Sequence, residues 1–259
     1  MSGAHALALT GPAGDPASPV HRLDPRAKLL GFLAITCTAV SAPLTAWFVY
    51  VGCALALAVL AAGARVPAGT IWRRARAMLL LVLLAAVFLP LIDRGGAEVA
   101  LGPLTLSVAG LAILATVAAK ATIGTVGAVL LGATTTYPAT LHALAALRVP
   151  RPFTLIAAMT YRYLFVLVEE VSRMRHALLA RGFRPRTALG AAATGRLAGS
   201  LFLRTHARGE RVYLAMAARG YTGTMPQLAR LAFRRRDAVF LAVLVGGLLA
   251  LRFCVELVA

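Results

Sequence analysis

Two short segments of this chain carry the pattern best suited to a specific function: Ala180-Arg181-Gly182 and Ala218-Arg219-Gly220. Each follows a stretch with helical character and is followed at once by an aromatic residue, Phe183 or Tyr221. Glycine ends a helix without a steric penalty, and arginine beside it lies near the negative end of the helix dipole. The pattern therefore predicts two helix ends, with arginines at positions 181 and 219, that present a guanidinium group to a partner.

A simpler interpretation stays open, because arginine followed by glycine is also a common way to end a helix. A third copy, Ala207-Arg208-Gly209, shows that the tripeptide alone is not specific. The third copy lacks both the alanine three residues earlier and the aromatic residue directly after. This context favours a partner-binding role for the other two copies.

The sequence contains no motif for catalysis or for a resident metal. It has no Gly-Lys dipeptide and so no phosphate-binding loop of the Walker A type, and it has neither H-E-x-x-H nor G-x-S-x-G. The 5 histidines are scattered, and the 3 cysteines form no C-x-x-C pair. We therefore predict a protein with no catalytic residues, no metal site and no cofactor.

The elements that position the two helix ends are predicted from hydropathy. Apolar residues make up 60% of the chain and the mean hydropathy is +0.81, which excludes an ordinary soluble domain. A helix needs roughly 20 apolar residues to cross a bilayer. We expect an all-α polytopic membrane protein with about five transmembrane helices, over 27–42, 44–62, 77–92, 104–131 and 237–257. Asp24 is expected to cap the first of these helices, with Pro25 at the first helical position.

The net charge of +18 follows the predicted topology. Of the 27 basic residues, 24 fall before or at the start of the first span, between the second and third, or between the fourth and fifth. The positive-inside rule then places the N-terminus in the cytoplasm and the C-terminus outside, with added attraction to anionic lipid. A membrane-tethered nucleic-acid binder is disfavoured, because orientation already explains the charge. Lys120 lies within the fourth span, where it either serves a pathway or pairs inside the bundle.

We divide the chain into a disordered tail (1–20), transmembrane helices 1–4 (21–136), a cytoplasmic helical region (137–236) and transmembrane helix 5 (237–259). Within the cytoplasmic region we expect a short helix from Tyr137 and long helices over 153–181 and 187–219. Arg162, Glu169 and Arg173 fall within about 40° of one another around a helix. This polar stripe argues that 153–171 lies at the membrane surface or under the bundle and does not cross the membrane.

A stripe of small residues in the last long helix includes Gly195 and Gly199. Such a stripe lets another helix backbone approach closely. The spacing arises easily by chance in a chain rich in alanine and glycine, so it is a weak signal alone.

Taken together, its motifs and spans make the sequence resemble the transmembrane T component of energy-coupling-factor importers, and most closely the cobalt/nickel-transport branch. The resemblance covers nearly the whole chain from His21 onward. It rests on the two Ala-Arg-Gly helix ends and on His21–Lys28, Thr134–Thr136, Leu144–Pro150, Tyr161–Tyr163 with Glu169-Glu170, Leu203-Arg204, Glu210–Tyr213 and Ala215-Met216.

The resemblance implies a subunit of a prokaryotic cell membrane that has long cytoplasmic coupling helices and no catalytic site. Arg181 and Arg219 would enter grooves on two ATP-binding-cassette ATPase subunits, either identical or different, and pair with acidic side chains there. The packing of Gly195 and Gly199 would help convert ATPase motion into reorientation of a separate substrate-binding S component. That component, and not this chain, would select cobalt or nickel.

Two related functions remain as alternatives. The chain could be the equivalent coupling component for a vitamin. It could also be a permease subunit of another ATP-driven transporter class, with its own substrate path through Lys120. That second class uses one short coupling helix with a glutamate-alanine-alanine pattern, which the sequence lacks.

Overall fold

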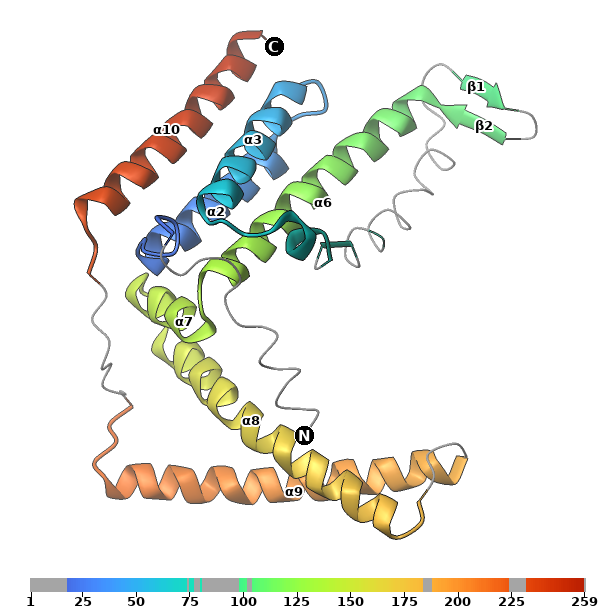
Figure 1. The fold of residues 1–259 in the computed structure, drawn as a ribbon, viewed down its shortest axis with the longest axis vertical. Coiled ribbons are helices and arrows are strands. Elements are labelled where there is room, and N and C mark those ends of the chain that lie inside the picture. Colours follow the sequence, from blue (N-terminus) through green and yellow to red (C-terminus); the bar gives the residue numbers. More distant parts are fainter. Residues whose placement is uncertain are drawn as a thin grey trace. The chain divides into compact units, whose positions relative to one another are not determined.

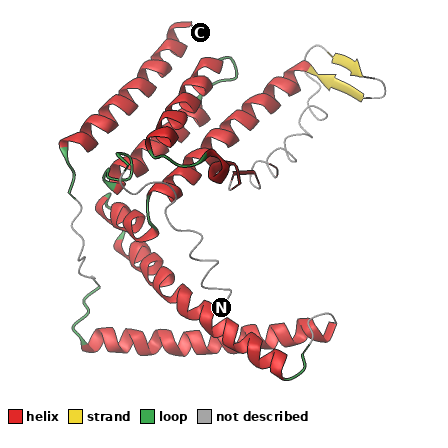
Figure 2. Cartoon of the chain, in the orientation of Figure 1, coloured by secondary structure: helices red, strands yellow, loops and turns green. Residues whose placement is uncertain are grey.

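The computed structural model of this protein describes residues 18–73, 75–76, 80, 98–101, 104–183, 188–223 and 232–258. Most of the tail expected over 1–20, nearly all of the span expected over 77–92, and residues 93–96 of the following loop lie outside the described residues. The described part is helical apart from one short hairpin (Figure 2). It divides into two compact units: Leu144–Arg230 belongs to one, and Gly11–Ala143 with Leu231–Ala259 to the other. We call the first the α8–α9 unit and the second the bundle unit.

The bundle unit contains α2 (Pro25–Ser41), α3 (Trp47–Gly63), α6 (Val108–Thr134) and α10 (Arg235–Val258). Helix α2 contacts α3, α6 and α10, and these helices lie side by side (Figure 1). The start of α2 is set locally, because the Asp24 side chain accepts a hydrogen bond from the Arg26 backbone N–H at 2.9 Å and Pro25 follows as the first helical residue. This start was expected from the sequence and is confirmed.

The core of the bundle unit is apolar and closely packed. Ile35, Val49, Cys53 and Leu130 are each 1% exposed or less. Its outer surface is apolar as well, since large side chains such as Val243 are more than half exposed. A helix bundle that is apolar both in its core and on its outer surface suits a lipid environment and not water.

Glycines allow α10 to approach its neighbours closely. A Cβ atom on Gly52 of α3 would lie 2.5 Å from Cδ1 of Leu251, and one on Gly31 of α2 would lie 3.2 Å from the Phe240 ring. A larger residue at Gly52 would force the Leu251 side chain to move, and one at Gly31 would crowd the Phe240 ring.

Three described helices are long and apolar enough to cross a membrane: Ala112–Thr134, Arg151–Ala180 and Arg235–Val255. Trp47–Gly63 is a shorter apolar helix, and α2 has 17 residues, the lower limit for a span. The chain is therefore a polytopic, all-α membrane protein, as expected. Length and composition alone also admit Arg151–Ala180 as a span, so the surface location of 153–171 stays a prediction.

The fourth span begins later than the sequence suggested. Residues Leu104–Ser107 form strand β2, which pairs antiparallel with β1 (Glu98–Leu101), and α6 begins only at Val108. The expected bounds of 104–131 are therefore wrong at the start, and the helix continues to Thr134. The alternation of apolar and hydroxyl side chains over 104–107 is the strand period of two, which the apolar count had hidden.

The remaining helices match the sequence analysis closely. Helix α7 covers Tyr137–Ala146, α8 covers Arg151–Ala180 and α9 covers Ala188–Ala218. Helix α8 has no buried residue, and α8 and α9 contact each other within their unit. Because so little of α8 is covered within the chain, the unit presents long helical faces to other molecules.

Candidate functional site

The first candidate helix end, at the end of α8, forms a complete Schellman motif. The Phe183 N–H donates to the Leu178 carbonyl oxygen at 3.1 Å, and the Gly182 N–H donates to the Leu179 carbonyl oxygen at 3.0 Å. Gly182 has a φ of +74°, the left-handed conformation that glycine adopts without a Cβ penalty. Arg181 is the C-cap residue, directly after the last helical residue Ala180.

The end of α9 repeats this geometry. The Tyr221 N–H donates to the Met216 carbonyl oxygen at 3.0 Å, and the Gly220 N–H donates to the Ala217 carbonyl oxygen at 3.0 Å. Gly220 has a φ of +77°. Arg219 therefore directly follows the last residue of α9, as Arg181 directly follows the last residue of α8. The prediction of two equivalent arginine-bearing helix ends is confirmed in its geometry.

Both arginines lie at the surface of the α8–α9 unit. Arg181 and Arg219 are exposed, and neither has an ion pair or a side-chain hydrogen bond within the part of the chain that the structure describes. The third copy differs, since Arg208 and Gly209 lie inside α9 and Gly209 has no positive φ. The sequence context thus separated the two helix ends from the interior copy correctly.

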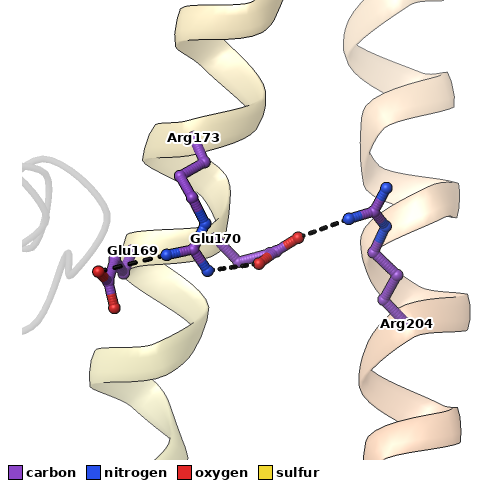
Figure 3. A network of polar contacts seen from close by, with 4 residues as sticks. All are labelled: Glu169, Glu170, Arg173 and Arg204. Atoms are coloured by element: carbon purple, nitrogen blue, oxygen red, sulfur yellow. Dashed lines mark hydrogen bonds and ion pairs between the residues drawn. The ribbon is translucent and has the colours of Figure 1, made fainter.

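Helices α8 and α9 are joined by an ion network (Figure 3). The Glu170 carboxylate contacts Arg173 Nη2 at 2.6 Å through one oxygen and Arg204 Nη1 of α9 at 2.7 Å through the other. The predicted pair within α8 also forms, with Glu169 and Arg173 3.2 Å apart. Arg173 and Arg204 therefore bind the two oxygens of one carboxylate, which links α8 to α9.

The sequence analysis had not assigned the Glu170–Arg204 pair a role. Both residues lie in segments that carry the family resemblance, but they are 34 positions apart and nothing in their spacing links them. The third member of the predicted stripe, Arg162, is not in the network. Its guanidinium carbon lies 6.0 Å from the centre of the adjacent Tyr163 ring, within cation–π range.

Gly195 and Gly199 face open space within this chain. A Cβ atom built on either glycine would meet no described atom within 4 Å. The packing role of this stripe therefore stays a prediction.

A buried polar cluster ties three helices of the bundle unit together. We call Asp24, Lys28, Thr134 and Asp237 the Lys28 cluster. Lys28 is 2% exposed, and its Nζ donates to the carbonyl oxygen of Thr134, the last residue of α6, at 2.8 Å. Asp237 is 1% exposed and accepts from the backbone N–H groups of Asp24 at 3.0 Å and Arg234 at 2.8 Å.

The Lys28 cluster lies inside the bundle unit, at the end of α6 and the start of α10. Lys28 binds the end of α6, directly before the chain continues into α7, and Asp237 fixes the start of α10, where the chain returns. The sequence analysis recognised only the cap at Asp24. A lysine in a long apolar segment gives no sign of which carbonyl group it will meet.

Lys120 and Arg252 act at the other end of α2. Lys120 of α6 donates to the Val40 carbonyl oxygen at 2.9 Å, and Arg252 of α10 donates to the Ser41 carbonyl oxygen at 2.9 Å. Two positive charges therefore satisfy terminal carbonyl groups of α2. For Lys120, this contact supports pairing inside the bundle and not a role in a pathway.

No group of three or more histidine, cysteine or acidic side chains that could hold a metal ion occurs among the described residues.

Comparison with known proteins adds independent information. The CbiQ family, described as a cobalt transport protein, matches residues 16–228. A protein of Bifidobacterium longum that is provisionally named an ABC transporter ATP-binding protein is 31% identical over 93% of this chain and 32% of its own length. An uncharacterized protein of Methanocaldococcus jannaschii is 32% identical over 48% of this chain and 44% of its own.

A third relative is a provisionally named fused cobalt transport protein, CbiMQ, of Methanocorpusculum labreanum. It is 32% identical over 30% of this chain and 13% of its own length. The chain thus spans less than half the length of each of these relatives.

Proposed function

Because the chain belongs to the CbiQ family of cobalt transport proteins, we propose that it is the transmembrane coupling subunit of an ATP-driven importer for a transition-metal ion such as cobalt. The observation that carries this proposal is the pair of matching Schellman ends, each with an exposed arginine that has no partner within the described residues. No phosphate-binding loop of the Walker A type occurs in this sequence, and ATP would be hydrolysed by the ATPase partners proposed below.

The partners we propose are two ATP-binding-cassette ATPase subunits, one at each helix end. The planar guanidinium groups of Arg181 and Arg219 would each bind a carboxylate on an ATPase subunit through two parallel hydrogen bonds. The Bifidobacterium relative supports this partner class, since a region similar to this chain occurs within a longer protein that is named for ATP binding. A separate membrane subunit, the S component, would bind the metal ion.

The α8–α9 unit could transmit motion because the Glu170–Arg204 ion pair links its two helices and both helices extend beyond this pair. From Glu170 to Arg181, α8 spans 11 residues, and from Arg204 to Arg219, α9 spans 15. At about 1.5 Å per residue these arms are about 16 Å and 22 Å long. When ATP closes the ATPase dimer, the two arginines would be drawn together and the arms would rotate about the Glu170–Arg204 contact. That rotation would reorient the S component.

This mechanism requires the α8–α9 unit to lie in the cytoplasm, where ATP is available. The distribution of basic residues supports this orientation, with the N-terminus inside and the C-terminus outside. The alternative of a separate substrate path through Lys120 loses its main support, because the Lys120 ammonium is bound to the end of α2. A vitamin as substrate remains the alternative within the same mechanism.

Co-purification tests the proposal. In detergent, the chain should bring down its ATPase pair, and the double variant Arg181→Ala with Arg219→Ala should release the pair and abolish ATP-driven uptake. The matched control is Arg175→Ala with Arg211→Ala, which removes two exposed arginines from the same helices. Retention of the ATPase and of uptake in the first double variant would show that the coupling proposal is wrong.

A further inference from the structure

A groove with three arginines lies between α8 and α9, next to the first helix end. We call it the basic groove. It has a volume of about 420 Å³ and includes Arg181 from α8 and Arg196, Ser200 and Arg204 from α9. Leu178 and Leu197 contribute an apolar surface to it. The groove therefore combines one of the two exposed helix-end arginines with a concave surface that has its own chemistry.

The basic groove carries excess positive charge. Of its three guanidinium groups only Arg204 is paired, with Glu170. Arg181 and Arg196 are exposed and have no acidic partner within the part of the chain that is described, and no carboxylate lines the groove. Clefts lined by one sign of charge focus the electric field and attract ligands of the opposite sign. The groove is thus suited to a ligand that brings carboxylates next to aliphatic groups.

A second groove between the same two helices has different chemistry. It has a volume of about 310 Å³ and lies between Met159–Leu167 of α8 and Thr205–Met216 of α9, towards the Arg219 end. Its only charged lining residue is Arg208, and its other lining side chains are mostly apolar. The two arginine-bearing helix ends therefore have the same backbone geometry but unequal surroundings.

We propose that the basic groove binds an acidic segment of the ATPase subunit that docks on Arg181, with Arg196 as an additional recognition residue. This inference rests on the proposed function, because it extends the same interface. Charge complementarity favours an acidic protein segment, and the continuity of the groove with Arg181 places that segment on the docked ATPase. Recognition at the Arg181 end would then use more charges than recognition at the Arg219 end, which would let two different ATPase subunits be told apart.

The test measures how tightly the co-purifying ATPase pair rebinds to the purified chain in detergent at low and high salt. We expect Arg196→Ala to weaken binding about 5- to 10-fold at low salt and less at high salt, because the contact is between charges. Arg196→Glu should weaken it further, and Arg196→Lys should retain most of the affinity. Arg211→Ala, an exposed arginine on α9 outside the basic groove, should change it less than about twofold.

Three outcomes decide the matter. Weaker binding with Arg196→Ala and not with Arg211→Ala supports the inference. If the double variant at 181 and 219 releases the ATPase while Arg196→Glu binds as tightly as the unmodified chain, the inference is overturned and the coupling proposal stands. If the Arg196 effect appears only in nanodiscs that contain anionic lipid, and not in detergent or neutral lipid, the groove binds lipid headgroups and the inference is also overturned.

Discussion

Replacement of Asp237 by alanine should strongly destabilise the bundle unit. The side chain is buried and accepts two backbone hydrogen bonds, from the N–H groups of Asp24 and Arg234. Alanine would leave both N–H groups without this acceptor. Each hydrogen bond to a charged acceptor is worth about 1.5 to 3 kcal/mol. Because one of the two donors is only partly buried, we expect a total loss of about 3 to 5 kcal/mol.

The expected loss can be measured as a shift in the melting temperature. For a protein of this size, a loss of about 1 kcal/mol of unfolding free energy lowers the melting temperature by roughly 2 to 4 °C. Asp237→Ala should therefore lower the melting temperature by about 6 to 20 °C. Helix content followed by circular dichroism during heating in one detergent measures this shift. Asp237→Asn keeps one acceptor oxygen in nearly the same shape and should show about half of the shift.

The control for this experiment is Glu210→Ala, which removes an exposed acidic residue of α9 whose ion-pair partner among the described residues is His206, at 3.6 Å. It should leave the melting temperature within about 2 °C, as exposed pairs contribute little. If the melting temperature of Asp237→Ala also stays within about 2 °C of the unmodified chain, the Lys28 cluster does not hold α2 and α10 together and our reasoning about it is refuted.

Three further predictions concern residues at helix ends or in the fourth span. Lys120→Met should lower the melting temperature by a few degrees but keep ATP-driven uptake within about twofold, because the ammonium binds a helix terminus; lost uptake in an intact complex would point to a pathway role. Arg148 has a φ of +64°, so Arg148→Gly should raise the melting temperature by a few degrees, and no rise would refute a strained backbone there. Gly182→Ala and Gly220→Ala should each lower the unfolding free energy by about 1 kcal/mol, because both glycines have a positive φ. Gly209→Ala, inside α9, should raise the unfolding free energy by a similar amount. The same shift in melting temperature for all three variants would contradict this difference in backbone conformation.

Local patterns in the sequence predicted what depends on a few neighbouring residues. The long helices expected over 153–181 and 187–219 match Arg151–Ala180 and Ala188–Ala218 within two residues at each end. Their ends were predictable because a glycine after an apolar helix stops it by its own conformational preference. The start of α2 was predictable for a similar reason, since Asp24 caps residues that follow it directly.

Contacts between distant residues could not be predicted in this way. The Lys28–Thr134 hydrogen bond joins residues 106 positions apart, and the Glu170–Arg204 pair depends on where α8 and α9 cross. The types of these residues and their separation along the sequence do not indicate that either pair is close in space. The same limit applies to the basic groove, which exists only because α8 brings Arg181 next to Arg196 of α9.

The start of α6 was misplaced for a different reason. A count of apolar residues over a window of about 20 cannot separate a short strand from the helix that follows it. Leu104–Ser107 adds to the apolar count of the window, yet its residues pair with Glu98–Leu101. A strand of four residues is too short to change the average.

The most direct measurement of the proposed coupling is the distance between the two helix ends during the ATPase cycle. Spin labels on Leu179→Cys and Ala217→Cys, both exposed, would report it in a chain whose three native cysteines are replaced by alanine. In the complex with the ATPase pair, we predict a shorter distance when ATP is bound and a longer one after hydrolysis. A distance that is the same in both states, while the ATPase remains bound and active, would contradict the proposal that these helix ends carry the motion.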